Sequence, residues 1–368
     1  MNGKQVILIG SVMADGEPVS DVAVKFKDRP CYISDLDGKF EYLASDQGFT
    51  IEKIDRDGYK LLSPKLPFMV QGNESPITIL MKYDEGFFQR RLRKKAEDLH
   101  EKALQLEKEN KLKEAAKLFM ERADLDPNNV RWQFEVGQFM YKYQDYKTAQ
   151  TYYNRAIKKA EELYGEKNQW LAQCYDAYGD NYFKWNVYFE SGMGDKNNVL
   201  HFADAKQYYQ QAGHFWYTLL GEQNDHTAWV YCNMAQCYVK LDNDQSAMHC
   251  VEKALSVVDS GNVSPGMKAK VYHSVGDSFH GLGEDEKSLH YLEMAYQINL
   301  SLYGENSQQV FWDYGSLITT LHAMGRLDET MATIQKLLLC TKVLYGEQHK
   351  VYKWVEDQML RLKNEMEG

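Results

Sequence analysis

A repeated unit of 34 to 42 residues constrains the fold of most of this 368-residue chain. Small residues mark the units: Ala115 and Ala149 are 34 residues apart, and a second series has successive spacings of 56, 42, 41 and 42 residues. That second series is Ala156, Ala212, Ala254, Ala295 and Leu337. A fixed period of this length is typical of a solenoid, in which each unit buries its apolar face against the next unit.

A short boundary phrase separates the units. Leu-Tyr-Gly-Glu begins at Leu163, Leu302 and Leu344, and the shorter Leu-Gly-Glu begins at Leu220. Between these boundaries, small residues face aromatic or large apolar ones, as two closely packed helices require. The small residues are Gly137, Gly179, Ala235 and Gly276 on the expected first helices, and Ala115, Ala149, Ala205 and Ala247 on the second helices. Each unit is therefore predicted to be a helix–turn–helix.

These residues resemble the tetratricopeptide repeat. The early units have its 34-residue length, and the later ones have the 42-residue length and the Tyr-Gly-Glu boundary of kinesin-light-chain-like repeats. The resemblance covers about residues 96–345 in six units and implies a right-handed α-solenoid, which we place at residues 96–350. Residues 351–368 are predicted to form a C-terminal capping helix whose inner face carries Val351, Trp354, Val355, Met359 and Leu362.

Residues 1–83 have a different character. They hold five of the seven prolines, and short β-type runs alternate in them with Asp-Gly turns at Gly16, Gly38 and Gly58. Asp-Gly marks a turn because glycine accepts a positive φ and aspartate hydrogen-bonds its own backbone. Strands that recur every 8–12 residues between such turns predict a small β-sandwich.

The N-terminal region also resembles the carboxypeptidase regulatory-like domain, over roughly residues 4–82. The resemblance rests on four segments: Gly10-Ser-Val12, Gly16-Glu-Pro18-Val19, Val22-Ala-Val24 and Ser34-Asp-Leu-Asp-Gly-Lys-Phe40. It implies a transthyretin-like sandwich that serves as an accessory module without catalysis. The predicted fold class is therefore multidomain, with a small β-sandwich at residues 1–83 followed by an α-solenoid of helix–turn–helix repeats.

Two segments admit alternative interpretations. Residues 84–95 form a basic linker or helix start, whose run Arg90–Lys95 is either a solvated helix opening or a contact for phosphate or an acidic membrane. One repeat carries about 14 extra residues near 185–198. This insertion is interpreted either as lengthened helices with a longer turn or as a loop that reaches over the binding face.

Charge and hydropathy exclude several classes of protein. A net charge of −10 disfavours a general nucleic-acid binder. No apolar run approaches the roughly 20 residues that cross a bilayer, so no transmembrane segment is expected. The first ten residues do not read as a signal peptide. The chain as given is predicted to be cytoplasmic, and periplasmic or part of the cell envelope if it is a piece of an exported protein. The six scattered cysteines are expected to be buried thiols.

No motif for catalysis or cofactor binding is found, so the chain is predicted not to be an enzyme and to need no cofactor or metal. Asp35-x-Asp37-Gly38 is interpreted as a turn, because an EF-hand loop needs further acidic ligands that are missing. His290 and Glu293 have the HxxE spacing of a zinc pair, but no third ligand follows, and we interpret them as surface residues.

The concave face of the solenoid is the best candidate site. The tetratricopeptide resemblance implies that positions 2, 5, 9, 12 and 13 of each first helix point into it. The candidate peptide-binding residues are Lys108, Arg131, Gln138, Tyr141, Lys142, Asp180, Phe183, Lys184, Trp229, Gln236, Lys240, Lys270, His273, Asp277 and Trp312. Position 13 is lysine in the first four units, at Lys108, Lys142, Lys184 and Lys240, which is either a site or repeat consensus. Basic stems beside aromatic and amide groups suit an extended acidic peptide.

The sequence thus predicts a non-enzymatic scaffold that binds a peptide or partner protein in the concave groove. The alternative is a structural accessory module of a cell-envelope or secreted assembly, with the sandwich as its docking domain. Neither the identity of the partner nor the oligomeric state follows from the sequence.

Overall fold

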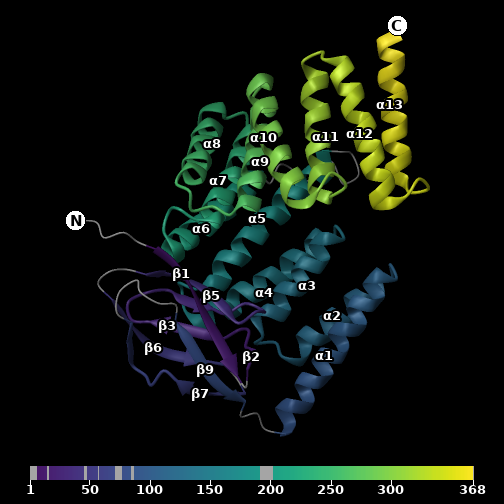
Figure 1. Ribbon diagram of the computed structural model, residues 1–368. Helices are drawn as coiled ribbons and strands as arrows, with labels where there is room; N and C mark the ends of the chain where they lie inside the picture. The colour runs from purple at the N-terminus through teal and green to yellow at the C-terminus, as the bar shows by residue number, and fades with distance from the viewer. Residues whose placement is uncertain are drawn as a thin grey trace. The chain divides into compact units, whose positions relative to one another are not determined.

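In the computed structural model, residues 6–14, 16–44, 48–56, 58–70, 77–83, 87–190 and 202–367 are described. The chain divides into two compact units, Met1–Glu222 and Gln223–Gly368. The first unit holds the β region and helices α1 to α6, and the second holds helices α7 to α13 (Figure 1). The predicted fold class, a β-sandwich followed by a solenoid of paired helices, is confirmed. The finer domain limits drawn from the sequence stay predictions.

The β region consists of two sheets. The strands are β1 (Val6–Ala14), β2 (Glu17–Pro18), β3 (Ala23–Phe26), β4 (Cys31–Ile33), β5 (Lys39–Ala44), β6 (Phe49–Asp55), β7 (Tyr59–Ser63), β8 (Phe68–Val70) and β9 (Thr78–Tyr83). One sheet has the order β2-β1-β9-β7, with β5 also paired to β1, and the other has the order β4-β3-β6-β8. Strand β1 is parallel to β9 and antiparallel to β5, with Ser11 opposite Thr78 and Gly10 opposite Phe40.

Aromatic side chains fill the core of the sandwich. The ring of Phe26 lies 5.1 Å from that of Tyr32 and 4.9 Å from that of Phe49, both edge to face. Gly10 leaves room for the ring of Phe40, since a Cβ at residue 10 would lie 2.2 Å from it. A domain of about 80 residues buries only a small apolar core, so the large area that these aromatic rings bury contributes much of its stability.

The sandwich packs against helices of its own unit. These are α1 (Phe87–Lys108), α2 (Leu112–Leu125), α3 (Val130–Lys142), α4 (Tyr146–Tyr164), α5 (Gln169–Glu190) and α6 (Phe202–Leu220). Strand β4, at the edge of its sheet, is capped by the α4–α5 connection: the Cys31 N–H donates to Lys167 O at 2.8 Å, and the Ile33 N–H to Gln169 Oε1 at 3.1 Å. The Tyr32 hydroxyl donates to Leu219 O at 2.8 Å. The edge strand is thereby covered, which removes a free edge that could pair with another chain.

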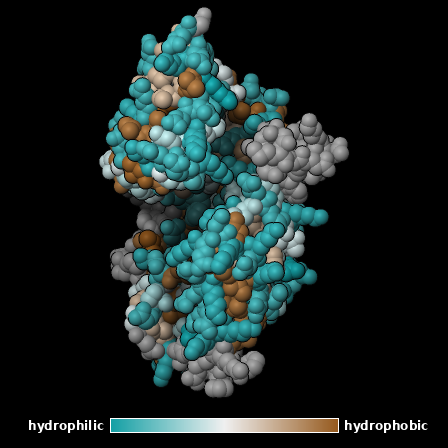
Figure 2. All heavy atoms as spheres, turned by 90° about the vertical axis from the view of Figure 1, so that its right-hand side faces the viewer, coloured by the Kyte–Doolittle hydropathy of each residue, from teal (hydrophilic) through white to brown (hydrophobic). Residues whose placement is uncertain are grey.

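The second unit consists of paired helices. They are α7 (Asp225–Lys240), α8 (Asp244–Asp259), α9 (Pro265–Gly281), α10 (Asp285–Tyr303), α11 (Gln308–Ala323), α12 (Leu327–Tyr345) and α13 (Lys350–Glu367). Asn224, Asn243, Ser264 and Ser307 cap the starts of α7, α8, α9 and α11 by accepting a backbone N–H from three residues on. The view onto α13 in Figure 2 shows hydrophobic patches among hydrophilic side chains.

The small residues of the repeats allow the helices of a pair to approach closely. A Cβ at Gly137 would lie 2.5 Å from the ring of Tyr153, and one at Gly179 would lie 2.6 Å from the ring of Tyr209. A Cβ at Gly276 would lie 2.6 Å from Leu292 Cγ. The boundary phrase is also explained, because Gly165, Gly304 and Gly346 end α4, α10 and α12 with φ of 80°, 81° and 82°. At that φ a side chain would be strained.

One expectation for the last helix is wrong. Val355 and Leu362 of α13 are buried and Met359 packs beside them, but Trp354 is 57% exposed. Successive residues of a helix are about 100° apart, so Trp354 lies well off the stripe that Val355 defines.

Of the two segments with alternative interpretations, the basic run lies in the first turns of α1. There Arg93 pairs with Glu97 at 3.6 Å, and Lys95 pairs with Glu121 of α2 at 3.1 Å. The side chains of Arg90 and Arg91 lie outside the described residues. The insertion predicted near 185–198 also lies outside them, apart from the backbone of α5 up to Glu190.

Candidate peptide-binding face

The first helices of the second unit, α7, α9 and α11, carry a row of large side chains at equivalent positions. Trp229 and Lys270 are 41 residues apart, and Lys270 and Trp312 are 42 apart. The ammonium of Lys270 lies 3.4 Å from the centre of the Trp229 ring, a cation–π contact. Trp312 is 60% exposed, and Lys270 is exposed as well. Two indoles and one ammonium thus occupy the same register on three successive first helices.

A polar network lies beside this row. His273 Nδ1 is 2.7 Å from Asp313 Oδ1, and the Asn299 amide donates to Asp313 Oδ2 at 2.8 Å. His273 Nε2 lies 3.5 Å from Asp277 Oδ2 and 3.3 Å from Ser316 Oγ. The carboxylate of Asp313 is buried, with only 1% of its side chain exposed, and both of its oxygens have partners. The network therefore ties α9 to α11 and fixes the orientation of the imidazole.

The environment of His273 favours its charged form. Burial lowers the pKa of His273, but the hydrogen bond to Asp313 and the negative charges of Asp277 and Asp313 outweigh it, so the pKa is raised above its usual value. Gln236 extends the polar surface on α7, where its amide donates to Ser274 Oγ of α9 at 2.9 Å.

We expect the ion pair between His273 and Asp313 to make the stability of the second unit depend on pH. Because the pKa of His273 is raised in the folded state, its contribution is fully present below the pKa of an unfolded histidine, about 6.5. It is lost as the pH rises through the folded pKa. The free energy of unfolding of wild type, relative to His273→Gln, should therefore decrease as the pH rises above about 6.5. Urea denaturation of both proteins at a series of pH values measures this difference in unfolding free energy. A difference that does not change with pH would contradict the raised pKa of His273.

Ser316, His273 and Asp313 form a serine–histidine–aspartate arrangement that sequence reasoning missed. The repeat register could have revealed it, because position 5 of α9 is His273 and positions 3 and 6 of α11 are Asp313 and Ser316. Hydrolysis by such a triad also needs donors for an oxyanion. Ser316 lies inside α11, whose backbone N–H groups are engaged in helical hydrogen bonds. We therefore interpret the three residues as part of the polar network.

In the first unit, several predicted groove residues have partners within the protein. The Lys142 ammonium donates to Glu107 at 2.6 Å, and the Tyr143 hydroxyl donates to the same carboxylate at 2.7 Å. The Glu107 hydrogen bond raises the pKa of Lys142. The carboxylate of Asp180 accepts the Tyr209 hydroxyl at 2.6 Å. The lysine at position 13 is thus neutralised locally in this repeat.

The remaining predicted residues differ in exposure. The ring of Phe183 packs 5.3 Å from that of Phe202, and burial raises the pKa of the Tyr141 hydroxyl. The exposed side chains are Lys108, Gln138, Lys184 and Lys240. Arg131 lies against the sandwich: its Nε donates to Asp21 Oδ1 at 2.6 Å, and its guanidinium lies 5.6 Å from the centre of the Trp170 ring. The helical register alone could not reveal that the sandwich covers this position.

The sequence motifs considered for metals have other roles. Asp35 Oδ1 accepts the N–H groups of Asp37 and Lys39 at 2.9 and 2.8 Å, which makes the segment a turn as predicted. His290 and Glu293 line a cavity of about 840 Å³ between α9, α10, α11 and α12. Among the described residues, no group of three or more His, Cys, Asp or Glu side chains is placed to hold a metal ion.

Comparison with known proteins finds similarity in fold. No family model matches the chain. No curated protein matches it either. A solved structure of BtubC (BKLC) from P. vanneervenii is 17% identical, with 77% of this chain and 94% of that chain covered and a TM-score of 0.41. A putative kinesin light chain with nearly identical TPR-like repeats from Podosopora anserina is 11% identical, over 59% of this chain and 96% of that chain, with a TM-score of 0.44.

PilW, described as a widely conserved type IV pilus biogenesis factor, is also 11% identical, over 71% of this chain and 97% of its own, with a TM-score of 0.43. The helix pairs, with their small residues at the close contacts, form a tetratricopeptide-like α-solenoid. No helix in the described ranges is both long and apolar enough to cross a membrane.

Proposed function

We propose that this chain is a non-enzymatic scaffold that binds a partner protein through an extended segment laid across α7, α9 and α11. The row of Trp229, Lys270 and Trp312 carries the proposal. Trp312 is 60% exposed, and a large exposed indole in register with a lysine is typical of an interface hot spot. The absence of a complete catalytic arrangement in the sequence motifs is consistent with a binding role.

The chemistry of the face suits a peptide with acidic and apolar side chains. The Lys270 ammonium offers charge to a carboxylate, while Trp312 offers a flat apolar surface. Gln236, Asp277 and Ser316 add donors and acceptors that a peptide backbone can use. In the first unit the pairing of Lys142 with Glu107 weakens the case for a continuous lysine column. We therefore place the acidic-peptide contact on the second unit.

Trp312→Ala is expected to weaken partner binding by roughly 30-fold or more, because truncating a central hot-spot residue typically costs at least about 2 kcal/mol. The measurement is recovery of copurifying proteins on the immobilised 368-residue chain, quantified by mass spectrometry. Trp354→Ala is the matched control, since Trp354 is an equally exposed indole, 57% against 60%, on α13. Partners recovered equally by both variants and wild type would refute the proposed face.

We also propose that the sandwich is related to the carboxypeptidase regulatory-like domain, which its two sheets and its Asp35–Gly38 turn support. A docking role for it is the alternative function. One sheet supports this alternative, because Ile9, Leu62 and Leu80 of β1, β7 and β9 are each about half exposed. The Trp312 experiment separates the two functions, since a docking-only role predicts unchanged partner recovery.

A further inference from the structure

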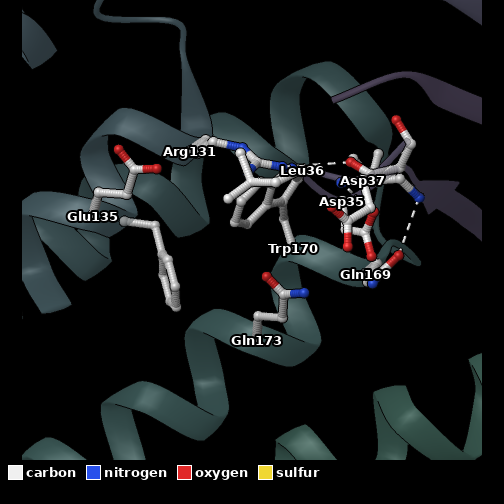
Figure 3. A pocket seen from close by; sticks show the side chains of 11 residues that line it. Asp35, Leu36, Asp37, Arg131, Glu135, Gln169, Trp170 and Gln173 are labelled. Atoms are coloured by element: carbon white, nitrogen blue, oxygen red, sulfur yellow. Dashed lines mark hydrogen bonds between the residues drawn. The ribbon is translucent and has the colours of Figure 1, made fainter. Parts of the chain in front are cut away.

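A cavity of about 400 Å³ lies in the first unit, where the turn after β4 faces α3 and α5. In Figure 3, Asp35 and Asp37 lie on one side, Gln169 and Gln173 project from α5, and Arg131 and Glu135 come from α3. Two modules that are separate in sequence thus contribute to one cavity.

The walls of this cavity are held in place. The Asp35 carboxylate fixes the turn through the N–H groups of Asp37 and Lys39. Gln169 accepts the Ile33 N–H, which holds the turn against α5. Arg131 is held by Asp21 and donates to Ser34 O at 3.4 Å. A preformed wall lowers the entropic cost of binding a ligand.

The charges around the cavity are unequal. Of its lining residues, Arg131 alone is cationic, and its charge is matched by Asp21. Glu135 is paired with Arg122. Asp37, by contrast, makes no side-chain hydrogen bond or ion pair with another residue of the described ranges. The turn therefore presents net negative charge beside the apolar surfaces of Leu36, which is 71% exposed, and Phe134.

We propose that this cavity binds a basic side chain, specifically arginine, of a partner protein. The aliphatic stem lies against Leu36 and Phe134, and the guanidinium donates to the Asp37 carboxylate and to the Gln173 amide oxygen. Arginine fits better than lysine because its planar fork supplies several donors in fixed directions, and the stem covers apolar surface. The inference rests on the proposed function only in that the ligand is protein, and it concerns a different unit from the Trp312 face.

The test uses N-acetyl-arginine amide as the probe and the full chain, with binding followed by NMR or calorimetry. Wild type should bind the probe saturably, whereas N-acetyl-citrulline amide, its neutral isostere, should bind at least about tenfold more weakly, as loss of a charge-assisted bond predicts. Asp37→Asn should weaken binding of the arginine probe by about tenfold, and Asp37→Lys should abolish it.

Asp28→Asn is the matched control, because Asp28 is another exposed aspartate of the sandwich, lies outside the cavity, and has a φ of 56° that asparagine tolerates. It should leave binding unchanged, and an unchanged thermal melt of Asp37→Asn shows that the variant is folded. Equal binding of the citrulline probe, or unaltered binding by Asp37→Asn, would overturn the proposal. A failed Trp312 experiment would leave this result unaffected, since the probe contains no peptide segment that needs α7, α9 or α11.

Discussion

Replacing Gly276 by valine should lower the free energy of unfolding of the second unit by about 3 kcal/mol, at the upper end of what overpacking typically costs. Gly276 lies on α9 opposite α10, where a new Cβ would be 2.6 Å from Leu292 Cγ and 3.2 Å from Ser288 O. The leucine can move only by displacing its neighbours, and the backbone oxygen cannot move without separating the helices. The gain in helix propensity over glycine, about 0.5 kcal/mol, is too small to compensate.

The measurement is hydrogen exchange of the α9 and α10 amides, because a chain of two units need not unfold in one step. Gly315→Ala is the control. Gly315 also lies within a helix, α11, but among the described residues nothing beyond its chain neighbours and its own helix backbone comes within 4 Å of the place that an alanine methyl would occupy. This variant should therefore be more stable by up to about 1 kcal/mol. Similar changes in unfolding free energy in the two variants would contradict the prediction, because they would show that α9 and α10 do not need a glycine at residue 276 in order to pack closely.

The periodic part of the fold could be predicted because its signals are local. Gly137, Gly179 and Gly276 recur where a second helix needs room, and Gly165 and Gly304 recur where a helix must end with positive φ. Neither requirement depends on distant residues. The packing of the sandwich on the helices could not be predicted, since it depends on pairs such as Tyr32 and Leu219, which are 187 residues apart.

The candidate site shows the same division. Repeat register placed Trp229, Lys270 and Trp312 at equivalent positions, and the cation–π contact follows from that register. Register does not specify which neighbouring side chain satisfies a charge, so the pairing of Lys142 with Glu107 was missed. A position in a helical repeat defines a face, but what covers that face is decided by the rest of the fold.

Arg131→Ala is therefore expected to destabilise the first unit rather than to affect peptide binding on the second. The Arg131–Asp21 pair is largely buried, with 13% and 10% of the side chains exposed. Removing one partner of a buried ion pair costs about 3–5 kcal/mol. We expect about 3 kcal/mol, at the lower end, because Arg56 remains 3.7 Å from Asp21 and keeps part of the compensation.

Hydrogen exchange at the edge of the sandwich distinguishes this effect from a general loss of stability. The amides of Cys31 and Ile33 donate to Lys167 and Gln169, so their exchange should accelerate in Arg131→Ala by about a hundredfold if the sandwich separates from the helices. Arg155→Ala on the exposed side of α4 is the control. The guanidinium of Arg155 lies 4.7 Å from the centre of the Tyr152 ring, so this variant should lower stability by at most about 1 kcal/mol. Unchanged protection of Cys31 and Ile33 in Arg131→Ala would mean that the backbone pairing and the apolar contacts of Trp170 hold the sandwich without the ion pair.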